Sequence, residues 1–139
     1  MRKLLSAMPV GLASFVVLVA VLYLTLYPNP LPENDIPLFP GADKVVHALM
    51  MFGLSGCVAY DYMRSRYGKD KMTPPKGMLL CLLALTTLFG GVIELLQSWM
   101  DVGRSEDILD FVADAAGAIV AFVVELLFWS RLRRWLTER

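Results

Sequence analysis

The stretch GMLLCLLALTTLFGGVIELLQSW, residues 77–99, decides the fold class of this chain. Its side chains are almost all apolar, and Glu94 is the single charged residue within it. A helix that crosses the hydrocarbon core of a bilayer needs about 20 mostly apolar residues, so this stretch predicts a membrane-spanning helix. The composition of the whole chain agrees, because 57% of its 139 residues are apolar.

Three further apolar stretches lie on either side of it, at residues 9–27, 44–60 and 108–129. Prolines, glycines and charged residues fill the segments between them and stop helices there. The first stretch also begins like a secretory signal peptide, but it is long and has no small-x-small cleavage site before Tyr27. No internal repeat or low-complexity tract divides the chain. We therefore predict one domain, residues 1–139, an all-α membrane protein built as a four-transmembrane-helix bundle.

The basic residues indicate the orientation of the bundle. Lys44 and Arg104 stand apart from all the others, which lie near the N-terminus, in the segment 63–76 or after Trp129. Cytoplasmic loops of membrane proteins are enriched in Lys and Arg. We therefore expect both termini and the 63–76 loop on the cytoplasmic side of the inner (cytoplasmic) membrane, with several passes across it. The formal net charge is zero, so nothing indicates a nucleic-acid partner.

Several ionisable residues lie inside the predicted spans. A charged side chain at the centre of a span costs about 2.5–3.5 kcal/mol on insertion scales, so it needs a partner, a water-filled cavity or a function. From the helical rise, Glu94 and Asp114 lie about 9 Å from the outer ends of their helices, and His47 lies somewhat shallower. Gln97 and Asp110 fall in the same outer layer, where a hydrogen bond that merely joins two helices would also explain them. Three ionisable groups at one depth, His47, Glu94 and Asp114, instead indicate a site.

Small residues accompany these polar positions. Gly90 and Gly91 precede Glu94 on one span, and small residues are frequent between Ala113 and Ala118 on another. Small residues let membrane helices approach each other closely. We therefore expect the polar faces of the last three spans to face one another.

Arg104 is the basic residue of the predicted outer turn, residues 100–107. In one interpretation it pairs with an acidic neighbour in the same turn, and an exposed pair of this kind contributes little to stability. In the other, its guanidinium binds a phosphate or a carboxylate together with Lys44. The sequence supports these two interpretations equally.

Polar residues follow one another along the chain in an ordered set of motifs: Asp43-Lys44-x-x-His47, Glu94-x-x-Gln97, Arg104-Ser105-x-Asp107, Asp110, and Asp114-x-x-Gly117. In order and spacing this set resembles the VanZ-like family of membrane proteins, over residues 43–117. The resemblance implies a bacterial membrane protein linked to glycopeptide resistance, because the family is named for a protein associated with resistance to teicoplanin. It implies no biochemical activity. Many relatives have asparagine where this chain has Asp114, so the polar layer here is more acidic.

The first functional hypothesis is a protein that binds or modifies a cell-envelope lipid at the outer face. Its partners would be membrane lipids, including a lipid-linked envelope precursor whose phosphate headgroup would meet Lys44, His47 and Arg104. The residues expected to bind this substrate are Lys44, Gln97, Arg104 and Asp110.

The second hypothesis is a membrane-embedded enzyme in which His47 is a general acid or base, and Glu94 or Asp114 orients it or holds a cation. One histidine with two carboxylates is a sparse ligand set, and no HExxH or DxD motif occurs. The sequence therefore predicts no metal site and indicates no particular cofactor. A small transporter or structural subunit is the third hypothesis, although transport would place the charged residues nearer the midplane of the membrane. The sequence does not indicate an oligomeric state.

Overall fold

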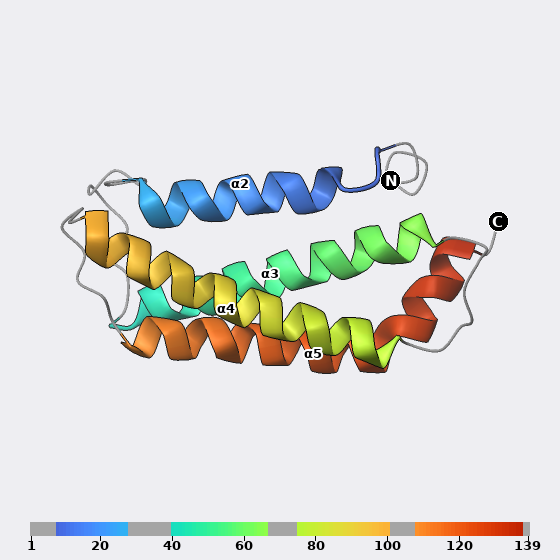
Figure 1. Ribbon diagram of the computed structural model, residues 1–139. Coiled ribbons are helices and arrows are strands. Elements are labelled where there is room, and N and C mark those ends of the chain that lie inside the picture. Colours follow the sequence, from blue (N-terminus) through green and yellow to red (C-terminus); the bar gives the residue numbers. More distant parts are fainter. Residues whose placement is uncertain (1–7, 28–39, 67–74, 101–107, 138–139) are drawn as a thin grey trace.

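The computed structural model describes residues 8–27, 40–66, 75–100 and 108–137. These residues contain no strand, and they form antiparallel helices that pack side by side (Figure 1). The helices are α2 (Leu12–Leu26), α3 (Ala42–Ser65), α4 (Lys76–Met100) and α5 (Ile108–Thr137).

Three of these helices, α3, α4 and α5, are long and apolar enough to cross a membrane. The fourth, α2, has 15 residues and is therefore about 22 Å long, whereas the hydrocarbon core of a bilayer is about 30 Å thick. It is shorter than the predicted stretch because Gly11, just before the helix, adopts a left-handed conformation with φ of 91°. The prediction of an all-α membrane bundle is confirmed. That α2 also crosses the membrane, and the orientation of the bundle, stay predictions.

Two predicted spans were too short at their C-terminal ends. Helix α3 continues beyond Tyr60 to Ser65, and α5 continues beyond Trp129 to Thr137. Hydropathy marks only the apolar part of a helix, whereas backbone hydrogen bonding carries the helix onward into polar sequence. The residues added in this way include Asp61, which proves to be a buried contact between helices.

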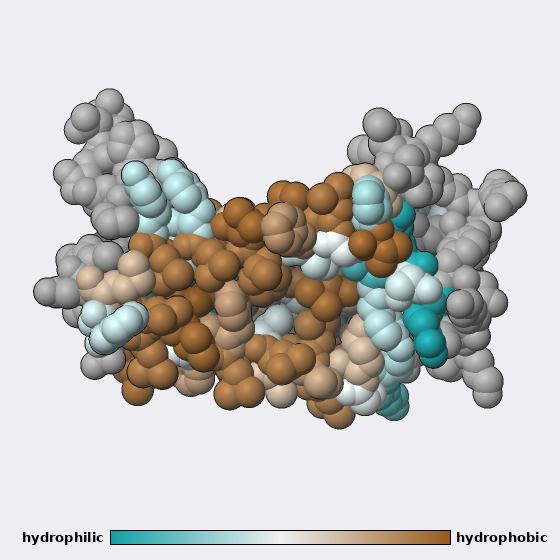
Figure 2. Space-filling view, turned by 45° about the horizontal axis from the view of Figure 1, so that its top comes forward, coloured by the Kyte–Doolittle hydropathy of each residue, from teal (hydrophilic) through white to brown (hydrophobic). Residues whose placement is uncertain are grey.

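The distribution of apolar side chains agrees with a lipid environment. Large apolar residues lie exposed along the outer faces of the helices, and Leu88 and Leu127 each remain 66% exposed. Figure 2 shows hydrophobic residues covering the middle of the visible face, with the more hydrophilic residues gathered toward one end. Soluble monomers rarely expose apolar surface on this scale, so the bundle is suited to a bilayer.

The closest packing joins α3 to α5. A Cβ built on Gly117 of α5 would lie 2.8 Å from Cα of Ala48 on α3, and closer still to the carbonyl oxygen of Ala48. Only glycine allows the two backbones to approach this closely. The sequence-based prediction that small residues bring the helices together is confirmed at this position.

Helix α2 is joined to the other helices by polar contacts at both of its ends. Near its start, a carboxylate oxygen of Asp61 accepts hydrogen bonds from the backbone N–H and the hydroxyl of Ser14, at 3.0 and 2.6 Å. Ser14 is in the first turn of α2, so Asp61 of α3 caps the start of a different helix. Near its end, the carbonyl oxygen of Thr25 accepts a hydrogen bond of 2.8 Å from Nε2 of Gln97 on α4.

Candidate functional site

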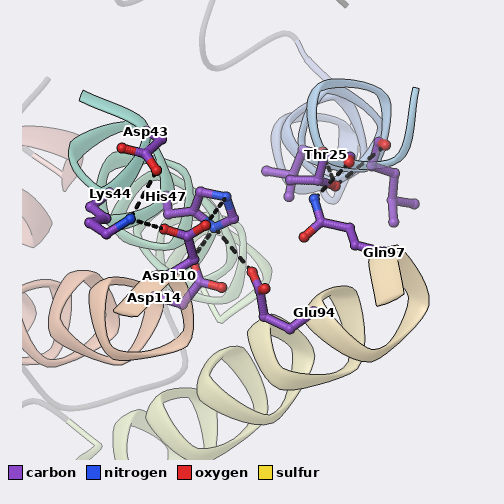
Figure 3. A network of polar contacts seen from close by, with 10 residues as sticks. Thr25, Asp43, Lys44, His47, Glu94, Gln97, Asp110 and Asp114 are labelled. Atoms are coloured by element: carbon purple, nitrogen blue, oxygen red, sulfur yellow. Dashed lines mark hydrogen bonds and ion pairs between the residues drawn. The ribbon is translucent and has the colours of Figure 1, made fainter. Parts of the chain in front are cut away.

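Ionisable residues from three helices converge near one end of the bundle (Figure 3). This end contains the starts of α3 and α5 and the end of α4, because neighbouring helices are antiparallel (Figure 1). We call the group the His47 cluster, and its members are Lys44, His47, Glu94, Asp110 and Asp114.

The imidazole of His47 is surrounded by carboxylates. Its Nδ1 lies 3.1 Å from Oδ1 of Asp114 and 3.7 Å from Oε1 of Glu94, and its Nε2 lies 4.0 Å from Oδ2 of Asp110. In the tautomer that carries its proton on Nδ1, His47 donates a hydrogen bond to Asp114 across the 3.1 Å contact. This contact orients the ring.

The local sequence explains how each side chain reaches the cluster. Lys44 and His47 are three residues apart on α3, and Asp110 and Asp114 are four apart on α5, so each pair lies on one helix face. Gly90, one turn before Glu94, makes room for the partner helix. A Cβ there would lie 2.5 Å from Oδ2 and 2.8 Å from Cβ of Asp114. Glycine at position 90 is therefore needed for Asp114 to occupy its place.

Exposure decreases steadily from the rim of the cluster to its base. The side chain of Asp43 is 57% exposed, that of Lys44 is 28%, that of Asp110 is 15% and that of Asp114 is 0%. Among the described residues, the cluster is therefore most exposed at Asp43 and Lys44 and fully buried at Asp114.

The ammonium group of Lys44 is held between two carboxylates. Its Nζ lies 2.9 Å from Oδ2 of Asp43 and 3.1 Å from Oδ1 of Asp110. These contacts balance much of its positive charge. Lys44 is thus less suited to binding a phosphate alone than its position in the sequence suggested.

The structure brings together five of the seven residues predicted to form the site. Gln97 differs: it is 3% exposed, and its amide nitrogen points toward Thr25 of α2 (Figure 3). This contact joins α4 to α2, as the alternative interpretation of Gln97 expected, and its role in substrate binding stays a prediction. Arg104 lies outside the described residues.

The sequence missed two polar contacts of this membrane bundle. The pair formed by Asp61 and Ser14 is separated by 47 positions, and the pair formed by Ser55 and Glu125 by 70. No spacing rule connects residues so far apart. The signal that was present is an acidic residue, Asp61, directly after an apolar stretch.

The base of the cluster has a composition that can hold a metal ion. His47, Glu94 and Asp114 each offer one ligand atom, and these three atoms all lie within 4.8 Å of one another. All three residues are buried. The sequence indicated that these three residues lie at one depth, but the distances between their ligand atoms depend on the packing of three helices.

Comparison with known proteins leaves the resemblance to the VanZ-like family resting on the motifs alone. No family model, no curated protein and no solved structure matches the chain.

Proposed function

We propose that this protein is a VanZ-like integral membrane protein that binds or modifies the polar headgroup of a membrane lipid at the outer face of the inner membrane. One observation carries the proposal. The side chains of the His47 cluster range from partly exposed at Lys44 to fully buried at Asp114, within helices whose outer surfaces are apolar.

The surroundings of the cluster support a lipid ligand. Exposed apolar side chains flank it at its own depth, including Leu49 on α3, Leu95 on α4 and Val112 on α5, which are all at least half exposed. Acyl chains would lie against these side chains. The headgroup of the same lipid would then be beside the entrance formed by Lys44 and Asp110.

The distribution of charge supports the outward orientation. Arg64, Arg66 and Lys76 lie at the end of the bundle opposite the cluster, together with Arg131 and Arg134 near the end of α5. We call this the basic end. By the positive-inside rule the basic end faces the cytoplasm and the His47 cluster faces outward. Glycopeptides act outside the membrane, so a protein that holds or alters a lipid-linked envelope precursor there would change the access of teicoplanin to it.

A second candidate function, acid–base catalysis on the same headgroup, is favoured by the 3.1 Å contact between His47 and Asp114. In such a pair the carboxylate orients the imidazole and stabilises its protonated form. The opposite nitrogen, Nε2, faces Asp110 on the more exposed side of the cluster. Nε2 would therefore be the atom that exchanges a proton with a headgroup.

The test of the proposal is the lipid that remains with the purified protein. The full chain would be purified in mild detergent, and lipids retained by wild type and by the His47→Gln variant would be identified by native mass spectrometry. We expect His47→Gln to lose the lipid class that wild type retains. Glu125→Gln is the matched control, because this isosteric change removes a carboxylate far from the cluster. Equal retention by wild type and His47→Gln would overturn the proposal.

A further inference from the structure

We propose that His47, Glu94 and Asp114 bind a divalent cation, and that this cation is Zn²⁺ or Mn²⁺. The sequence predicted no metal site, so this inference depends on the arrangement of the three helices. It extends the proposed function, because it adds a metal ion to the same His47 cluster. Its importance for the ligand rests on the proposed function of that cluster.

The distances within the group fit metal coordination. Bonds of about 2.0–2.2 Å in a tetrahedral arrangement place neighbouring ligand atoms about 3.3–3.6 Å apart. Nδ1 of His47 lies 3.1 Å from Oδ1 of Asp114 and 3.7 Å from Oε1 of Glu94, which brackets that interval. Figure 3 shows the three side chains pointing toward one another from α3, α4 and α5. Small rotations of these side chains, with release of the Nδ1 proton to solvent, would complete three ligands around one ion.

The charges at the base of the cluster favour a cation. An imidazole carries at most one positive charge, yet two carboxylates, those of Glu94 and Asp114, face the same nitrogen of His47. Asp114 is 0% exposed, and its Oδ2 has no hydrogen-bond partner among the described residues. Two buried, ionised carboxylates that face the same nitrogen repel each other in a medium of low dielectric constant. A divalent cation would offset both charges.

The ligand types narrow the choice of ion. One imidazole with two carboxylates suits Zn²⁺ or Mn²⁺, whereas Cu(I) prefers thiolate or thioether ligands, which this group lacks. Three protein ligands leave a coordination position open, as catalytic metal sites do.

A bound cation also explains how an acidic cluster would receive a phosphate headgroup. Lys44 is held by Asp43 and Asp110, so the carboxylates would repel a phosphate that approached without further positive charge. A metal ion with an open position would instead bind the phosphate oxygens directly. The chemistry of the ligand is thus a phosphate or pyrophosphate group bound through a cation.

Metal content tests the inference. The full chain in detergent would be stripped with a chelator, equilibrated with Zn²⁺ or Mn²⁺, dialysed and measured by mass spectrometry of the elements. We expect about one ion per chain for wild type, and at least about tenfold weaker binding for Asp114→Asn, which keeps the size of the side chain. Glu125→Gln, a matched change outside the cluster, should bind as wild type does. Co²⁺ would serve as a spectroscopic probe, since nitrogen and oxygen ligands bound directly to it change its visible absorption.

Two results would overturn the inference. The first is less than half an equivalent of bound Zn²⁺ and of Mn²⁺ in wild type; the second is equal affinity in wild type and Asp114→Asn. Glu94→Gln provides a second variant, and helical circular dichroism checks that each variant is folded.

The inference and the proposed function can fail separately. If His47→Gln loses metal but still retains the lipid, the cation site stands and the proposed headgroup site is wrong. If His47→Gln loses the lipid while wild type binds no metal, the headgroup site stands and the cation site is wrong.

Discussion

The two ends of the bundle both bury carboxylates, but they provide them with different partners. At the basic end, Asp61 accepts hydrogen bonds from the N–H and the hydroxyl of Ser14, and Arg64 lies near it. At the opposite end, Asp114 and Glu94 converge on one nitrogen of His47. A carboxylate that accepts hydrogen bonds from neutral donors holds two helices together, whereas two carboxylates that share one ring stabilise the fold poorly. The partners of a buried carboxylate, and not its burial alone, therefore decide whether it indicates a functional site.

Glu125 resembles Asp61 in this respect. Its Oε1 accepts a hydrogen bond of 3.0 Å from the hydroxyl of Ser55, which joins α5 to α3 at a distance from the His47 cluster. In the sequence, Glu125 and Asp114 are both acidic residues within an apolar stretch. Their partners distinguish them: Glu125 contacts the hydroxyl of Ser55 and joins two helices, whereas Asp114 contacts His47 in the candidate site.

The largest expected effect comes from adding a side chain where α3 and α5 pack most closely. Gly117→Ala would place a Cβ against the backbone of Ala48, which cannot move aside as a flexible side chain could. We expect the free energy of unfolding to fall by about 3 kcal/mol, as measured by unfolding in mixed detergent. Gly56→Ala is the control, because nothing lies within 4 Å of a Cβ at that position. Similar losses in both variants would contradict the close approach of α3 and α5.

An intermediate effect is expected at the basic end. Asp61→Ala removes the acceptor for both donors of Ser14, so the start of α2 loses its cap. The free energy of unfolding should fall by about 2 kcal/mol, in the range of a lost cap and a charged hydrogen bond. Lipid retention and metal content should stay as in wild type when measured on the folded fraction. A loss of either would show that the two ends of the bundle are not independent.

The smallest expected effect has the opposite sign. In protein stripped of metal, Asp114→Asn should raise the free energy of unfolding by about 1 kcal/mol, because it removes one of two repelling carboxylates. The asparagine carbonyl can still accept the hydrogen bond from Nδ1 of His47. Thermal unfolding with and without chelator measures the change. If Asp114→Asn destabilises the protein as much as Asp61→Ala does, the distinction between the two ends is lost.

Much of the candidate site follows from the sequence because helices are periodic. The spacing of Lys44 to His47 and of Asp110 to Asp114 places each pair on one helix face, and the structure brings all four together. The same reasoning did not indicate the partner of Gln97. Gln97 is one turn from Glu94 and shares its general direction, but it meets α2 instead of α3 and α5. Periodicity shows which residues share a face, and not which helix that face meets.

The sequence by itself determined that this protein is a helical membrane bundle, and it placed Glu94 and Asp114 at one depth. Hydropathy and the helical rise are local properties, so a single chain contains them. Only the tertiary structure decided that both carboxylates face one nitrogen of His47 and that Asp61 caps α2. Those contacts depend on how closely the helices approach. That approach is set by glycines such as Gly90 and Gly117, which the sequence shows as small residues without showing which atoms of the opposite helix they meet.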